Sequence, residues 1–376
     1  MTIAKNSIKF LTILAVVFTS FTVLASGNNI DPETSKGGGK IDTKNEIDAY
    51  MKHHLADSHD FSLFSYTNDA EERKHIGFPL PIIVWTSKGL RTFMSSEFHH
   101  NDDGHLVVNA NGVQLTKIHS KIHEVDQGAE EVIFDETHHA TNAHKVLDFS
   151  ITKNIVGILL TALLMFLGFK SLANGYKKGA IPTGFSRVLE PLVLYVRDEI
   201  ARPNIGEKHY RKFIGFLLTV FFFIWILNLL GLTPLGFNVT GNIAVTVCLA
   251  LFTFFIVQFS ANKDYWKHIF WMPGVPVPMK IVLMPIEILG MLTKPFSLLI
   301  RLFANITAGH AVVMGLVAVA YVAREALGTV GGFSVSLILT LFISLIEILV
   351  AFLQAFIFTM LSSLFIGMAV EEHDHH

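Results

Sequence analysis

The stretch Pro295-Phe-Ser-Leu-Leu-Ile-Arg301-Leu-Phe-Ala-Asn305-Ile-Thr-Ala-Gly-His310 places one arginine inside an apolar segment. From Ser297 to Ala323, Arg301 is the only Lys, Arg, Asp or Glu. A guanidinium group keeps its proton at physiological pH, and placing it in hydrocarbon costs at least ~2.5 kcal/mol. Such a charge is expected to face a protein partner or a hydrated cavity, and it usually marks an ion pathway.

The composition of the whole chain indicates a polytopic membrane protein. Of its 376 residues, 51% are hydrophobic and 16% are charged, and the mean hydropathy is +0.48. The formal net charge of -2 gives no indication of a nucleic-acid partner. A single cysteine, Cys248, excludes a disulfide within the chain.

Residues 1–25 are typical of a secretory signal peptide. Lys5 and Lys9 precede the apolar run Phe10 to Leu24. Ala25 is a small residue of the kind found at signal-peptide cleavage sites. The alternative interpretation is an uncleaved first transmembrane helix. In both cases the residues that follow begin outside the cytoplasm.

Residues 26–150 form a polar, histidine-rich extension, for which we predict a small β-containing extracytoplasmic domain. Asn111-Gly112 suits a tight hairpin turn between two of its strands. The strand candidates are Pro81 to Thr86, Leu90 to Met94, Leu106 to Asn109 and Val113 to Ile118.

Twelve of the 18 histidines lie between His53 and His144. Adjacent histidines on a strand point to opposite faces, so the pairs are poor chelators on their own. The sequence has no His-Glu-x-x-His helix, and we predict neither a metal nor another cofactor. A solvated surface that responds weakly to pH is the preferred interpretation, and a metal site is the alternative.

Residues 151–370 form the membrane domain. Apart from the β-containing extension, we predict an all-α polytopic membrane protein. Because a span needs ~20 helical residues, the last two apolar segments are long enough to tilt steeply. Gly328, Gly331 and Gly332 separate these two segments, which predicts an antiparallel hairpin. The five predicted spans are at about 154–173, 213–232, 243–260, 281–323 and 334–370.

The charges of the loops predict the orientation of these spans. The loop from Lys170 to Lys212 holds nine Lys and Arg residues, and the loop from Gly231 to Gly241 holds none. The positive-inside rule therefore places the first loop in the cytoplasm. With five spans starting outside, the tail 371–376 is expected in the cytoplasm.

Four polar residues of the hairpin form two predicted layers. Facing residues of an antiparallel pair have roughly constant index sums, which are 655 for Arg301 with Gln354 and 657 for His310 with Glu347. At 1.5 Å per residue these layers lie ~10 to 14 Å apart. Asn305 follows Arg301 by one helical turn on the same face.

This arrangement predicts a proton route that ends at Arg301. His310 and Glu347 can exchange protons, whereas Arg301 cannot and acts as an electrostatic barrier. Glu287 precedes Arg301 on the cytoplasmic side, as does Lys294. Purely structural roles are the alternatives: helix bridging by Asn305 and Gln354, interfacial anchoring by Glu287 and Lys294, and a structural His310–Glu347 bond.

The segment Glu287 to Gly309 resembles the signature of subunit a of F-type ATP synthases, a bacterial form with a long N-terminal extension. The run that starts at Glu347 and continues through Gln354-Ala-Phe-Ile-Phe is similar to the same family. Asn228 to Pro234 and Thr240 to Thr246 resemble its earlier helices. The resemblance covers about residues 185 to 372.

The resemblance implies roles for individual residues. Arg301 matches the essential arginine that faces a carboxylate of the rotating ring, Gln354 matches its partner glutamine, and Asn305 matches a nearby asparagine. Glu287 matches the acidic residue near the cytoplasmic outlet. His310 and Glu347 match the two inlet positions, with the acid and the histidine exchanged between the arms, and Ala304 replaces a common glycine.

The family implies a non-catalytic stator subunit in the bacterial inner membrane. Its partners are the ring of c subunits, the b-subunit peripheral stalk, the remaining ATP synthase subunits and the lipid bilayer. Two other function classes remain open from the residues alone. A secondary transporter with a histidine-rich metal-sensing domain predicts internal repeats, and an intramembrane metalloenzyme needs clustered ligands within the spans.

Overall fold

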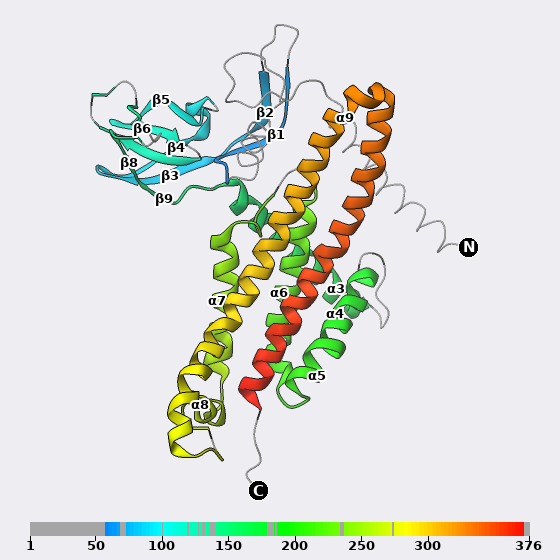
Figure 1. Ribbon diagram of the computed structural model, residues 1–376. Coiled ribbons are helices and arrows are strands. Elements are labelled where there is room, and N and C mark those ends of the chain that lie inside the picture. Colours follow the sequence, from blue (N-terminus) through cyan, green and yellow to red (C-terminus); the bar gives the residue numbers. More distant parts are fainter. Residues whose placement is uncertain are drawn as a thin grey trace. The chain divides into compact units, whose positions relative to one another are not determined.

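The computed structural model describes residues 57–371 except 68–72, 100, 119, 127, 130–131, 136–139, 179–183, 185, 234–236 and 273 (Figure 1). The predicted signal peptide and the start of the extension lie outside the described residues. The chain forms two compact units. The described parts of 1–157, 233–238 and 311–343 make the first unit, and those of 158–232, 239–310 and 344–376 make the second.

The β domain of the first unit contains antiparallel sheets in the part of the chain that is described. One sheet has the order β1-β2, the second β4-β3-β9 and the third β5-β6-β7-β8 (Figure 1). The strands are β1 (Asp60–Thr67), β2 (Arg73–Pro79), β3 (Pro81–Thr86), β4 (Gly89–Met94), β5 (Asp103–Ala110), β6 (Val113–Ile118), β7 (Lys121–Val125), β8 (Ala143–Lys145) and β9 (Leu147–Asp148).

A small apolar core joins the second and third sheets of this domain. Ile82 and Val84 of β3 are fully buried together with Leu115 of β6, and Ile122 of β7 is 1% exposed. Phe98, in the 3-10 helix η1 (Ser95–Phe98), belongs to the same cluster. Alternate residues of β3 therefore point into the domain, which fixes the opposite face of that strand as the outer one.

The hairpin predicted around Asn111-Gly112 is present between β5 and β6. Asn111 has φ 54° and Gly112 has φ 85°, the left-handed conformations that this turn requires. The four predicted strands correspond to β3, β4, β5 and β6. The strands β1, β2, β7, β8 and β9 were not predicted. The pairing of β1 with β2 shifts register between Ser62 and Phe64, which makes this pair irregular.

Five described helices are long and apolar enough to cross a membrane. They are found within α3 (Lys153–Lys178), α6 (Tyr210–Gly231), α7 (Ile243–Ser260) and the two arms of α9 (Val277–Val370). The shorter helices are α4 (Ser186–Tyr195), the π-helix η2 (Val196–Ala201), α5 (Arg202–Ile205) and α8 (Lys263–Phe270). The predicted fold class, a polytopic helical protein with a β-containing N-terminal region, is confirmed.

The hairpin predicted for the last two spans corresponds to α9. Helical geometry is interrupted at Gly328, with φ 72° and ψ 169°, which a glycine adopts without the steric cost of a Cβ. We call residues 277–327 the first arm and residues 329–370 the second arm. The first arm remains helical through Pro285 and Pro295.

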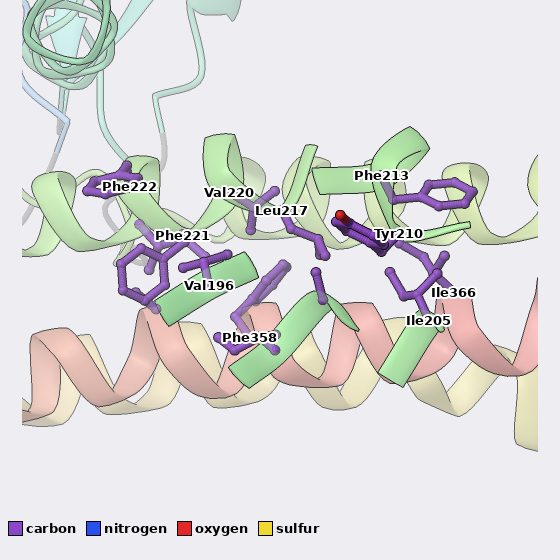
Figure 2. Close-up of a cluster of buried hydrophobic side chains, with 14 of the residues drawn as sticks. Val196, Ile205, Tyr210, Phe213, Leu217, Val220, Phe221, Phe222, Phe358 and Ile366 are labelled. Carbon is purple, nitrogen blue, oxygen red and sulfur yellow. The ribbon is translucent and has the colours of Figure 1, made fainter. Parts of the chain in front are cut away.

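The second unit has an apolar core to which α6 and the second arm contribute (Figure 2). Leu217 and Phe221 of α6 and Val196 of η2 are fully buried, and Phe358 of the second arm is 3% exposed. Gly367 meets the main-chain carbonyl of Asn204 in α5, and a Cβ on this glycine would collide with that oxygen. This close approach requires glycine, because every other residue would force the two helices apart.

Candidate functional site

Gln354 joins the two arms at the level of Arg301. Its Nε2 donates a hydrogen bond of 2.7 Å to the main-chain carbonyl of Arg301, and its side chain is 2% exposed. The structure thus brings together the two residues that the index sum of 655 predicts to face each other. The acceptor is the carbonyl oxygen of Arg301, so the guanidinium group takes no part in this bond.

The side chain of Arg301 lies on a face of the first arm that the described part of the chain leaves uncovered. Leu298 and Leu302, one turn apart, are each 2% exposed and pack into the core of the second unit. Arg301 is exposed, as are Ile300 and Ala304. Among the described residues, none forms a hydrogen bond or an ion pair with its guanidinium group.

Glu347 forms part of a second polar level. Its Oε1 lies 3.0 Å from the position that a Cβ on Gly309 would occupy, and the carboxylate is half-buried. The small residue allows the second arm to approach at this point. Glu347 is seven residues from Gln354, so the two levels are ~10 Å apart along the helix.

The backbones of Asn305 and His310 are helical and belong to the first arm. Their side chains lie outside the described residues. The predicted contact of His310 with Glu347 therefore stays a prediction. Gly309, directly before His310, is the first-arm residue that the structure places against Glu347.

A third group of polar residues lies nearer the start of the first arm. The ammonium group of Lys294 lies 5.9 Å from the ring centre of Tyr265 in α8 and 5.3 Å from that of Phe365 in the second arm. Burial raises the pKa of the Tyr265 hydroxyl, and the negative charge of Glu287 raises it further. Glu287 is therefore within electrostatic reach of this aromatic and cationic group, and it is half-buried.

The sequence did not indicate Tyr265 and Phe365 as neighbours of Lys294. Both rings come from other helices, and cation–π contacts have no sequence spacing when the partners are distant in the chain. Gly309 could have been found from the sequence, because its index sum with Glu347 is close to the value predicted for facing residues. The sequence favoured an interfacial anchor for Lys294, and in the structure its ammonium group contacts the rings of Tyr265 and Phe365.

The two earlier motif segments meet at the end of α6. The hydroxyl of Thr240 donates to Oδ1 of Asn228 at 2.9 Å, and both side chains are buried. Asn242 caps α7, because its Oδ1 accepts a hydrogen bond from the main-chain nitrogen of Ala244. The polar residues of these segments thus fix the connection between α6 and α7.

In the β domain, the described histidines do not build a metal site. Within the described residues, no group of three His, Cys, Asp or Glu side chains could hold a metal ion. Buried His59 is bonded to Asp148, with Nε2 2.7 Å from Oδ2. Burial acts to raise the pKa of Asp148, but the hydrogen bonds from His59 and Ser150 outweigh it and lower the pKa below its usual range.

Comparison with known families and proteins identifies the membrane half of the chain. Residues 155–367 match the family model described as ATP synthase A chain, which is more than half of the chain. Residues 50–149 match a second model, described only as a domain of unknown function (DUF8433). The extension and the membrane half thus correspond to separate family models.

Several curated relatives are similar over about three fifths of the chain. "ATP synthase subunit a 2" of Chlorobaculum tepidum is 46% identical over 237 residues, which is 61% of this chain and 66% of that protein. "ATP synthase subunit a" of Chlorobium phaeobacteroides is 44% identical, covering 61% and 68%. The protein of that name from Myxococcus xanthus is 43% identical, covering 61% and 76%.

These matches give no support to the secondary-transporter alternative. They agree with the apolar helices in indicating a multi-pass membrane protein. The matched region includes Arg301, Gln354, Glu347 and Glu287, the polar residues whose positions the structure describes. The chain belongs to the ATP synthase subunit a family.

Proposed function

We propose that this chain is the proton-conducting stator subunit of an F-type ATP synthase, and that it loads and unloads the carboxylates of a rotating c-ring. The observation that carries this proposal is Arg301, a permanent cation on the uncovered face of the first arm. A charge at membrane depth requires a partner, and the described part of this chain provides none for the guanidinium. A ring carboxylate that passes along this face meets that requirement.

Protons enter from the extracytoplasmic side past His310 and Glu347. The approach of Glu347 to Gly309 supports an inlet level on the outer side of Arg301. A carboxylate of the ring takes up a proton there and becomes neutral. In that form it can rotate through lipid, because a neutral acid avoids most of the cost of burying a charge.

Protons leave toward the cytoplasm near Glu287. The ring carboxylate releases its proton after nearly a full turn and becomes negative again. The electrostatic effect of Glu287 on Tyr265 and the contact of Lys294 with the Tyr265 ring support a polar outlet at this end of the first arm. Asn305 follows Arg301 by one helical turn, and we propose that it assists the exchange.

Arg301 separates the two half-channels. It pairs transiently with the bare carboxylate and repels a proton that would otherwise cross directly. A fully desolvated pair would bind too tightly to release, so the site has to stay partly hydrated. Gln354 supports this arrangement, because it holds the main chain of Arg301 and leaves the guanidinium free to follow the ring.

We infer that the β domain lies outside the cytoplasm and the C-terminus lies inside. The first unit combines the β domain with residues 233–238 and 311–343, which contain the two connections assigned to the outside. Within that unit, the rings of Phe61 in β1 and Phe237 are 5.5 Å apart. The b-subunit stalk and the remaining subunits complete the complex in a bacterial inner membrane.

Replacing Arg301 by alanine tests the proposed function. We expect coupled ATP synthesis to be lost while the complex still assembles, because the exposed side chain contributes little to packing. Arg187→Ala, a change at an exposed arginine in the first turn of α4, serves as the control and should retain synthesis. Normal synthesis in the Arg301 variant would reject the proposal. Purification of the complex and identification of its subunits tests the partners.

A further inference from the structure

The outer face of the sheet β4-β3-β9 is apolar and exposed. Residues that are paired across antiparallel strands share a face, and Trp85 is paired with both Leu90 and Leu147. The exposed fractions are 56% for Trp85, 52% for Leu90 and 66% for Leu147. Phe149, 62% exposed, continues the row, because its main-chain nitrogen donates to the carbonyl of Ile83 opposite.

This face cannot be the interior of the β domain. The inward side of the same sheet carries Ile82 and Val84, which are fully buried against the four-stranded sheet. Both large aromatic groups of the outer face are more than half exposed, as is Leu147. A contiguous apolar surface of this kind in a folded domain marks a site of contact with a partner or a membrane.

The same sheet is continuous with the first transmembrane helix. After β9, the main-chain nitrogen of Ile151 donates to the carbonyl of Pro81 at 3.2 Å, so the pairing with β3 continues to the residue before Thr152. α3 starts at Lys153, and this residue also begins the first candidate span. Phe149 is thus four residues from the span, which is at most ~14 Å of extended chain.

The start of α3 is fixed to the β domain. The main-chain nitrogen of Lys153 donates to the carbonyl of Ser58 at 2.9 Å. The carboxylate of Asp57 accepts from the hydroxyl of Thr152 at 3.0 Å and from the main-chain nitrogen of Asn154 at 3.2 Å. A flexible linker is therefore absent at this point of the described chain, and the sheet is held close to the first residues of this candidate span.

We propose that the outer face of β4-β3-β9 lies on the lipid bilayer and inserts its aromatic side chains into the headgroup region. Trp85 has the residue type that is enriched at membrane interfaces, where an apolar ring and a polar N–H group are both accommodated. Continuity with α3 favours lipid over a protein partner, because the bilayer is present beside the start of every span. Contact of this face with lipid is independent of the ion pathway at Arg301.

Photo-cross-linking in the assembled complex tests this inference. The benzophenone amino acid p-benzoylphenylalanine is introduced at Leu147 and, in a second variant, at Trp85, in the full chain in native membranes. Lys121 of β7, exposed on the outward side of the other sheet, is the matched control position. After irradiation, the mass of the subunit is measured.

We expect both test variants to gain the mass of one phospholipid, and we expect the Lys121 variant not to gain it. An adduct with another subunit or with a second copy of the chain would overturn the inference, because it would identify a protein as the occupant. The absence of lipid adducts at both test positions in an assembled complex would also overturn it. Either result leaves the proposed role of Arg301 intact.

Discussion

Replacing Gln354 by leucine tests whether one hydrogen bond keeps the two arms of α9 in register. Nε2 lies 2.7 Å from the carbonyl of Arg301, and the side chain is 2% exposed. Leucine has a similar volume, so the change removes the bond without leaving a large cavity. Bonds of this kind between membrane helices contribute ~0.6 kcal/mol on average and up to ~1.7 kcal/mol, which corresponds to a factor of about 3 to 18 in the aligned population.

Replacing Gln354 by glutamate is expected to be more severe. A carboxylate cannot donate to the carbonyl of Arg301, so the glutamate would have to be protonated to restore the bond. Protonating a carboxyl group at neutral pH costs roughly 4 kcal/mol. If it remains ionised, it instead places a fixed negative charge beside Arg301 and competes with the carboxylate of the ring.

The assay is ATP synthesis driven by an imposed proton gradient in inverted membrane vesicles, normalised to the amount of the subunit. Thr293→Val is the matched control. Among the described residues, the hydroxyl of Thr293 bonds only within its own arm, to the carbonyl of Gly290 at 2.9 Å. We expect wild-type synthesis in the control, up to about an 18-fold loss with leucine and a larger loss with glutamate. Wild-type rates in both Gln354 variants would refute the reasoning.

Three further predictions follow from the packing and from the β domain. Gly309→Val should displace the carboxylate of Glu347 and lower proton-driven synthesis, whereas Gly290→Val, with open space around its Cβ, should not. Gly367→Ala should destabilise the complex by about 1 to 3 kcal/mol in thermal unfolding, because its Cβ overlaps a main-chain carbonyl of α5. The pKa of Asp148 is lowered in the folded state, so its stabilisation exists above about pH 4 and is lost as the pH falls through the folded value. Asp148→Asn should therefore reduce the acid-induced gain in protease sensitivity of the β domain; an unchanged acid response would contradict this assignment.

The sequence predicted the membrane hairpin well because few polar residues interrupt its apolar arms. The lone charge at Arg301 and the position of Gln354 define an index sum, and the structure places these residues at the same level. The rotation of each helix about its axis could not be predicted in the same way. The bond of Gln354 goes to the main chain of Arg301 and not to its guanidinium group, which the index sum could not predict. Gly309 lies against Glu347, and the contact of Glu347 with His310 stays a prediction.

Contacts between distant segments were beyond prediction from the sequence. Tyr265 belongs to α8, and no pattern of polar residues in that helix indicates a contact with Lys294. In the β domain, the regular strands β3 and β6 could be predicted from their composition and bounding turns. β9 could not, because its two residues are too few to form a pattern. Its pairing with β3 depends on tertiary structure and is what creates the apolar outer face.

Disulfide cross-linking between the first arm and the c-ring tests whether Arg301 faces the ring. In a Cys248→Ser background, a cysteine at Ala304, on the exposed face beside Arg301, is compared with one at Leu302, which is 2% exposed. The second cysteine is placed next to the carboxylate of the ring. We expect cross-linking from Ala304 and none from Leu302. Failure at Ala304, or equal yields at both positions, would contradict the claim that Arg301 faces the ring.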